Sequence, residues 1–194
     1  MKKIQDHYFK EARKQGYVAR SAFKLEEMDR KFRLLRRGQH VIDLGCAPGS
    51  WLQYAAKKVL PEGSLTGVDL KQVKIQFPES VRILQSDIYI LEESILASSR
   101  FDLVLSDMAP DTTGIPSVDS QRSYDLNSQA LSFAQRHLKP GGTLVLKAFQ
   151  GEPLNRLKSE IRPCFESFKL FKPKSSRSES VEIFVLGFGL LPQS

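Results

Sequence analysis

Four aspartates of this sequence stand at or just after the ends of short apolar runs that are typical of buried β-strands: Asp43, Asp69, Asp87 and Asp107. The carboxyl ends of parallel strands meet at one edge of a sheet, where open α/β folds bind ligands, so we expect the four carboxylates around one crevice. A single aspartate at a strand end is usually a helix cap or a turn former. Four like charges repel unless something compensates them. Magnesium, which favours oxygen ligands, and a ligand with hydroxyls, an amine and a positive centre both meet that need.

The loop after the first of these strands, GCAPGSW from Gly45 to Trp51, narrows the class of ligand. It has neither the GxxxxGK[ST] signature of phosphate-binding loops nor the GxGxxG signature of dinucleotide-binding enzymes, which argues against an NAD-dependent oxidoreductase. Asp69 lies 24 residues after Gly45, where an acidic residue holds a ribose diol. An adenosine-bearing cofactor without pyrophosphate fits best, and this points to S-adenosylmethionine.

The elements that must position these residues follow from the spacing of apolar residues, which alternates between strand and helix patterns from residue 40 onward. The loop from Met108 to Arg122 is long enough to be functional. The predicted strands are His40–Leu44, Ser64–Leu70, Val81–Gln85, Phe101–Ser106, Thr143–Phe149, Ser167–Phe171 and Val181–Phe188. The predicted helices are 19–36, with Ser21 as its N-cap and Gly38 as its stop, then Ser50 to about Val59, a short one around Ile90–Ala97, about Ser123 to Leu138, and Leu154–Ile161.

The last two predicted strands are joined by KPKSSRSES alone. Parallel neighbours need a dozen or more connecting residues, so this pair should be antiparallel. The sequence therefore predicts an α/β fold in one domain over residues 1–194, with a mostly parallel sheet, an antiparallel final strand and helices on both faces. Residues 1–18 are polar with few apolar anchors, and we expect them to pack loosely.

Composition and charge bound the class of protein. The chain has 194 residues, no apolar run long enough to span a membrane and no apolar segment after its first lysines, so we expect a cytoplasmic protein, with a mitochondrial location left open. Its two cysteines lack metal-ligand spacing. Residues 1–40 hold 12 Lys and Arg against 5 Asp and Glu, and residues 147–194 hold 8 against 5. Such basic ends suit a polyanion such as nucleic acid, or form a solvated surface; charge alone leaves both open.

Six segments in this order, RSAFKLEE, DLGCAPGSW, VDL, SDMAP, LVLKAFQG and KPKSSRSESVEIF, resemble the FtsJ-type RNA ribose 2′-O-methyltransferases. The resemblance runs from about Tyr17 to Gly187 and implies the Rossmann-like sheet of S-adenosylmethionine-dependent methyltransferases. It also implies a catalytic tetrad, which by motif is Lys24, Asp107, Lys147 and Glu182. Glu179 is the other candidate for the last position, but the spacing from Lys172-Pro173 and the Ile-Phe-Val run that follows favour Glu182.

The chemistry explains why such a tetrad contains lysines. Methyl transfer to a ribose hydroxyl needs an in-line arrangement and a base for the hydroxyl proton. A lysine, whose pKa is about 10.4 in water, becomes a base when burial or a second ammonium lowers that pKa. We expect Lys147 to be the base, Lys24 and Glu182 to position the target nucleotide and Asp107 to orient the lysine. The structural alternative for Lys147 is an end-of-strand lysine that reaches solvent.

The resemblance also implies roles around the cofactor. The backbone of the loop would approach the methionine part, the second aspartate would bind the ribose hydroxyls, the third would bind the adenine amine, and the loop tryptophan and the fourth aspartate would lie near the methionine end. The tryptophan also falls on the apolar face of its helix, so a packing role remains open. The implied cofactor-binding residues are Gly45, Gly49, Trp51, Asp69, Asp87 and Asp107.

The expected partner is large-subunit rRNA or the assembling large ribosomal subunit. The Asp-Met-Ala-Pro form at 107–110 and the short chain resemble the ribosomal, RrmJ-like branch, which modifies a uridine of the 23S-type A loop; Asp111-Thr112-Thr113 departs from that branch. A tRNA anticodon-loop methyltransferase and a non-catalytic RNA-binding assembly protein are the alternatives. We expect a monomer without a resident metal, and residues 1–38 should contribute to RNA binding and catalysis. The predicted RNA contacts are Arg20, Arg36, Arg37, Lys174 and Arg177.

Overall fold

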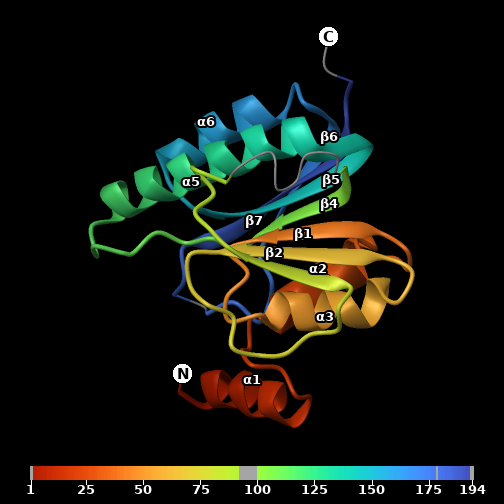
Figure 1. The fold of residues 1–194 in the computed structure, drawn as a ribbon. Helices are drawn as coiled ribbons and strands as arrows, with labels where there is room; N and C mark the ends of the chain where they lie inside the picture. The colour runs from red at the N-terminus through yellow and green to blue at the C-terminus, as the bar shows by residue number, and fades with distance from the viewer. Residues whose placement is uncertain (1, 92–99, 178, 193–194) are drawn as a thin grey trace.

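The sheet at the centre of the molecule has the strand order β3-β2-β1-β4-β5-β7-β6 (Figure 1). The computed structural model describes residues 2–91, 100–177 and 179–192, and within these ranges the sheet has seven strands. The strands are β1 (His40–Leu44), β2 (Ser64–Asp69), β3 (Val81–Gln85), β4 (Phe101–Ser106), β5 (Leu138–Phe149), β6 (Phe165–Phe171) and β7 (Glu182–Leu190).

One strand runs against the others. β3, β2, β1, β4 and β5 pair in parallel, whereas β7 pairs antiparallel with β5 on one side and with β6 on the other. In this register Glu182, the first residue of β7, lies opposite Phe149, the last residue of β5. The prediction of a mostly parallel sheet with an antiparallel final strand is confirmed.

Helices cover both faces of the sheet, as predicted (Figure 1). Side chains of successive strand residues point to opposite faces, so Leu103 and Leu105 of β4 join one core and Val104 joins the other. One face carries α1 (Lys2–Lys14), α2 (Ala22–Phe32) and α3 (Ser50–Val59), and the other carries α5 (Pro116–His137) and α6 (Glu152–Ile161). Within the described ranges, no helix has both the length and the apolar character that a bilayer span requires.

The second helix ends earlier than its apolar spacing predicts. α2 stops at Phe32, because Arg33 takes the left-handed conformation with φ 56°. Asp29 then accepts the backbone N–H of Leu35 at 2.8 Å and the hydroxyl of Tyr54 at 2.8 Å, which turns the chain toward β1 and ties it to α3. The predicted stop at Gly38 is therefore wrong. Ser21 precedes the helix but makes no side-chain cap.

The predicted loop from Met108 to Arg122 is too long, since α5 already begins at Pro116. Proline is favoured in the first turn of a helix, and Asp119 in that turn accepts hydrogen bonds from the backbone and hydroxyl of Thr113 and from the backbone of Gly114. The backbone hydrogen bond from Thr113 is the main cause of the lowered pKa of Asp119. These polar residues have no apolar periodicity that could announce a helix.

Other boundaries differ by a few residues. β5 begins at Leu138 instead of Thr143, through an irregular pairing with the start of β4, and α6 begins at Glu152. The N-terminal segment is a helix with buried anchors at Ala12 and Tyr17, and not the loosely packed segment expected from its polarity. The helix predicted around Ile90–Ala97 falls largely on 92–99, outside the described residues.

Candidate functional site

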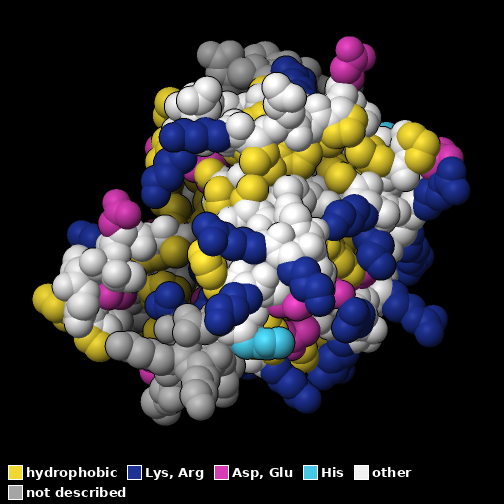
Figure 2. All heavy atoms as spheres, turned by 90° about the horizontal axis from the view of Figure 1, so that it is seen from below, with side chains coloured by type: hydrophobic (Ala, Val, Ile, Leu, Met, Phe, Trp, Pro, Cys, Tyr) yellow, Lys and Arg dark blue, Asp and Glu magenta, His cyan; other side chains and the backbone are white. Residues whose placement is uncertain are grey.

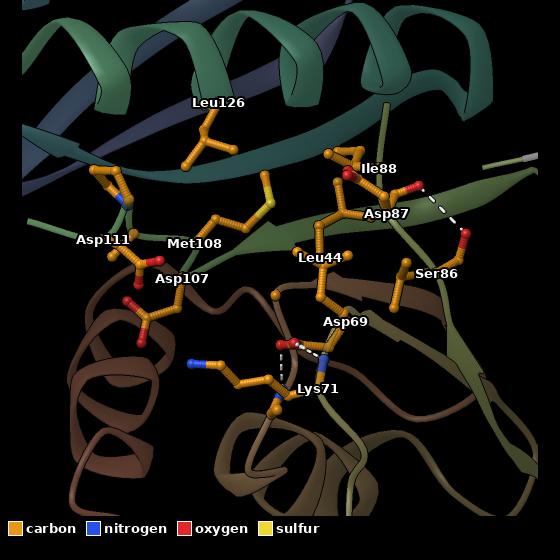
Figure 3. A pocket seen from close by; sticks show the side chains of 16 residues that line it. Leu44, Asp69, Lys71, Ser86, Asp87, Ile88, Asp107, Met108, Asp111 and Leu126 are labelled. Carbon is orange, nitrogen blue, oxygen red and sulfur yellow. Dashed lines mark hydrogen bonds between the residues drawn. The ribbon is translucent and has the colours of Figure 1, made fainter. Parts of the chain in front are cut away.

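The carboxyl ends of β1, β2 and β4 and the loop after β3 surround a pocket of about 430 Å³ (Figure 3). Three of the four predicted aspartates, Asp69, Asp87 and Asp107, line it, so the convergence expected from the sequence holds for these three. Apolar side chains form much of the remaining wall, among them Leu44, Val68, Ile88, Met108, Pro110 and Leu126. A pocket of this kind suits a ligand with a flat apolar part and several polar groups.

Asp69 holds the two turns that frame the pocket. Its Oδ2 accepts the backbone N–H of Ala47 at 2.8 Å, and its Oδ1 accepts the backbone N–H of Lys71 at 2.7 Å (Figure 3). Each carboxylate oxygen can accept more than one hydrogen bond, so Asp69 can still bind hydroxyls of a ligand. Asp87 is used less by the chain, since its Oδ1 accepts one backbone N–H, that of Tyr89, at 3.0 Å.

Both predicted glycines of the loop sit where a side chain is excluded. Gly45 has φ +79°, and a Cβ there would lie 2.5 Å from Cγ of Met108, so the glycine lets the loop after β1 approach the loop after β4. Gly49 has φ +108°, and a Cβ there would lie 2.8 Å from Cδ1 of Ile75. Gly45 lines the pocket, whereas Gly49 is not one of the described residues that line it.

Trp51 is buried behind the loop. Its indole N–H donates to the carbonyl of Ser21 at 2.8 Å, and its ring lies 5.8 Å from that of Phe184. Ser21 and Ser50 also share a hydrogen bond between their hydroxyls at 2.7 Å. Trp51 thus joins the start of α3 to the start of α2, and it is not among the described residues that line the pocket. Its predicted place near the cofactor stays a prediction.

Asp43 lies beneath the pocket and not in its wall. It is 1 % exposed, and neither of its carboxylate oxygens has a hydrogen-bond partner within the described part of the chain. Burial raises the pKa of Asp43 well above its ordinary value, and the negative charges of Asp107 and Asp69 raise it further. Asp43 therefore keeps its proton to a higher pH than an exposed aspartate does.

The predicted tetrad comes together beside the pocket as two pairs of a lysine and a carboxylate. Lys24 of α2 lies 2.6 Å from Glu182 of β7. Lys147 of β5 lies 2.9 Å from Oδ1 of Asp107 as an ion pair and donates a hydrogen bond to the Asp107 carbonyl at 2.5 Å. Both lysines are less than a tenth exposed. The alternative in which Lys147 reaches solvent is therefore wrong.

Glu182 is the electrostatic link between the two pairs. Burial acts to raise its pKa, but the Lys24 charge, hydrogen bonds from Lys24 and Ser176 and the Lys147 charge outweigh burial, so the pKa of Glu182 is lowered. The hydroxyl of Ser176 donates to its Oε1 at 2.7 Å. Glu182 thus pairs with Lys24 and also interacts electrostatically with Lys147. Glu179, the rejected candidate, is exposed on the loop before β7.

Sequence reasoning missed three residues that shape the site. Lys71 lines the pocket, and its side chain extends toward the side occupied by Asp107 (Figure 3). Asn127 of α5 donates to the carbonyl of Lys147 at 2.9 Å and fixes that end of β5 from the opposite face. Ser176 acts on Glu182. Of these three residues, only Lys71 had a signal in the sequence, because it lies two residues after Asp69, which was predicted to bind the cofactor.

The predicted RNA contacts fall on two edges of the molecule. Lys174 and Arg177 lie on the loop before β7, at the edge that carries the tetrad, and Arg20 precedes α2. Arg36 and Arg37 lie before β1, and a five-residue strand places them about 16 Å from the pocket. Arg37 is also paired with Glu62.

Lys and Arg side chains are spread over the face that carries α1 and α3 (Figure 2). Among the side chains of its three helices whose exposure is described, the exposed basic ones are Lys10, Arg13, Lys14, Arg30, Lys31, Lys57 and Lys58. This face adjoins both groups of predicted RNA contacts. The positive charge of the N-terminal part of the chain therefore lies largely on one face of the molecule.

The burial of Asp43 predicts a pH-dependent stability. The unfolded chain ionises Asp43 at its ordinary pKa, whereas the folded chain keeps it protonated to a higher pH, so the free energy of unfolding falls as pH rises from the ordinary pKa through the raised one. Asp43→Asn cannot ionise and escapes this loss. In urea unfolding at about pH 4 and about pH 8, the variant should gain on the wild type at the higher pH. Asp125→Asn, at an exposed position of α5, should show no such gain. An unchanged difference at both pH values for Asp43→Asn would contradict the assignment.

Comparison with known proteins places the chain in a family. Residues 17–190 match the model of the FtsJ-like methyltransferases. The Ribosomal RNA large subunit methyltransferase E of Desulfatibacillum aliphaticivorans is 46% identical over 186 residues, which cover 95% of this chain and 90% of that one. The protein of the same name from Oleidesulfovibrio alaskensis is 43% identical over 193 residues, covering 97% and 93%.

A solved structure agrees in fold. The crystal structure of a Plasmodium falciparum protein that is named as a ribosomal RNA methyltransferase superposes with a TM-score of 0.80 at 28% identity, over 91% of this chain and all of that one. The matched family model covers the pocket, both lysine–carboxylate pairs and the reversed strand. The chain belongs to the FtsJ-like methyltransferase family.

Proposed function

We propose that this protein transfers the methyl group of S-adenosylmethionine to a ribose 2′-hydroxyl of large-subunit ribosomal RNA. The observation that carries the proposal is the arrangement of Lys24 with Glu182 and Lys147 with Asp107 at the edge of a pocket lined by aspartates. Proton removal from a hydroxyl needs a buried base with a partner that holds it, and Lys147 is such a group. Relatives named for methylation of large-subunit rRNA support the substrate.

The residues of the pocket fit S-adenosylmethionine. Asp69 offers free lone pairs for a ribose diol, and Asp87 offers a carboxylate oxygen for an exocyclic amine. Ile88, Leu126 and Met108 offer an apolar wall for a purine. When bound, the cofactor supplies an electrophilic methyl on a positively charged sulfur. The carboxylate of Asp107, which lines the pocket and contacts Lys147, would join the donor end of the pocket to the base.

The remaining steps belong to the chain. Lys147 first loses a proton to solvent, and its neutral Nζ then accepts the proton of the attacking 2′-hydroxyl. Asp107 stabilises the ammonium that results through its side chain and its carbonyl. Lys24 and Glu182 hold the target nucleotide, and their mutual ion pair keeps each in place before RNA arrives. Three of the four groups are buried and Asp107 is partly buried, which limits the access of water and strengthens these electrostatic contacts.

The base assignment predicts a variant that binds but does not react. Lys147→Ala should lower the rate of methyl transfer by about 10²- to 10⁴-fold, the usual contribution of a general base, and leave cofactor affinity unchanged. Lys139→Ala is the matched control, because Lys139 lies on the same strand at its other end and pairs with Asp102. It should retain the wild-type rate in single-turnover assays. Near-normal transfer by Lys147→Ala would exclude Lys147 as the base.

The ribose assignment of Asp69 predicts a loss of affinity. Asp69→Ala should weaken S-adenosylmethionine binding by more than about tenfold in calorimetry, or about 1.4 kcal/mol. Because Asp69 also holds two backbone N–H groups, a cycle with an analogue that lacks the ribose hydroxyls separates the two roles. The wild type should discriminate against the analogue, and Asp69→Asn should discriminate less. Equal discrimination by both proteins would remove the ribose role.

The target nucleotide is proposed to be a uridine of the A loop of 23S-type rRNA, in keeping with the Asp107-Met108-Ala109-Pro110 segment. Tritiated cofactor, offered with undermethylated large subunits, free rRNA and tRNA, should label that uridine. Label in tRNA alone would move the substrate to the anticodon loop and leave the mechanism standing. RNA binding without label in any substrate would favour a non-catalytic assembly protein. Since phosphate contacts dominate, RNA affinity should fall steeply with salt.

A further inference from the structure

Another hollow, of about 590 Å³, lies between α1, α2 and the end of β6. Three aromatic side chains line it: Tyr8 from α1, Phe23 from α2 and Phe171 from β6. We propose that this hollow binds an unpaired base of the RNA strand that flanks the target nucleotide. The inference rests on the proposed function and adds to it a site that the tetrad and the cofactor do not use.

The aromatic lining has ring surface to offer. Phe171 is partly exposed, and the ring of Tyr8 lies 5.6 Å from that of Phe23, which is nearly buried. The ammonium of Lys31 lies over the Phe171 ring, 4.7 Å from its centre, so a base that stacks on this ring would take the place of the ammonium. Proteins that bind single-stranded RNA stack splayed bases on aromatic side chains and place cations beside them, because every base has a π-face.

The charge of the hollow favours a polyanion. Its two acidic residues are engaged by the chain: Glu26 pairs with Arg30 at 2.6 Å, and Glu27 accepts the backbone N–H groups of Lys174 and Ser175 at 2.7 and 2.8 Å. The lining also contains three exposed lysines whose side chains take no part in the contacts of Glu26 and Glu27: Lys31, Lys172 and Lys174. A base in the hollow would therefore have cations within reach of its flanking phosphates.

The hollow is built onto the catalytic residues. Glu27 fixes the loop after β6 through its two backbone contacts, and Ser176 of the same loop donates to Glu182. Glu182 pairs with Lys24, which follows Phe23 of the hollow directly in α2. A strand with its target ribose at Lys24 and Lys147 would place a neighbouring nucleotide at the hollow. An unpaired nucleotide suits it, because a base held in a duplex cannot reach the rings.

The test combines a protein variant that lacks the aromatic ring with RNA substrates that lack one base. Phe171→Leu keeps an apolar side chain against Phe32 and removes the stacking surface. It should weaken RNA binding about tenfold, raise KM for RNA and leave kcat and cofactor affinity unchanged. Phe171→Tyr, which keeps a ring, should restore the affinity. The matched control is Phe168→Leu on the same strand, since Phe168 packs against the other core of the sheet; its RNA affinity should equal that of the wild type.

RNA substrates with abasic sites identify which base binds in the hollow. Substrates with an abasic site at successive positions around the target should bind the wild type less tightly when one position is abasic, and Phe171→Leu should be insensitive at that position. Wild-type affinity of Phe171→Leu, or equal sensitivity of both proteins at every position, would overturn the proposal. An effect of Phe171→Leu on assembled subunits but not on naked RNA would also overturn it and assign the hollow to a ribosomal protein. Failure of the wild type to methylate any RNA would instead reject the proposed function.

Discussion

The reversal of β7 is the constraint on which the site depends. In the parallel strands each carboxyl end lies at the ligand edge, so a residue reaches the site by standing late in its strand, as Lys147 does in β5. β7 runs the other way, and its first residue, Glu182, therefore reaches the same edge. A parallel strand with the same sequence would place Glu182 at the far edge, and Lys24 would be a buried cation without a counter-ion. Burying an unpaired charge is costly, so the burial of Lys24 depends on the direction of β7, which brings Glu182 to it.

The carboxyl groups at that edge differ in how the protein compensates them. Asp107 pairs with Lys147 and Glu182 pairs with Lys24, whereas Asp43 is buried without a hydrogen-bond partner among the described residues, and its pKa is raised well above the ordinary value. Asp69 accepts two backbone N–H groups. Three of the four are aspartates, so the differences come from their surroundings and not from the residue type.

From residue 19 onward the sequence predicted the order of the described strands and helices. The bounds of β1, β3, β4 and α3 agree with the structure, because apolar runs at strand and helix spacing depend on local burial. The prediction failed where tertiary contacts decide. The end of α2 is set by Asp29 and Tyr54, which lie 25 residues apart, and the start of α5 is set by a polar turn around Asp119. In the site, the tetrad came from a resemblance over many segments. The burial of Asp43 and the part played by Ser176 need the packed structure, since neither follows from residue spacing.

The hydrogen bond from Trp51 to the carbonyl of Ser21 joins the end of the loop after β1 to the helix that carries Lys24. With the hydrogen bond between Ser21 and Ser50, it ties the start of α2 to the start of α3. The tilt of α2, and with it the position of Lys24, therefore depends on the start of α3, which follows Gly49. Under the proposed function, the loop would serve the cofactor and Lys24 would serve the RNA. A substitution that shifts the loop would then also shift Lys24, so that cofactor binding and RNA positioning would change together.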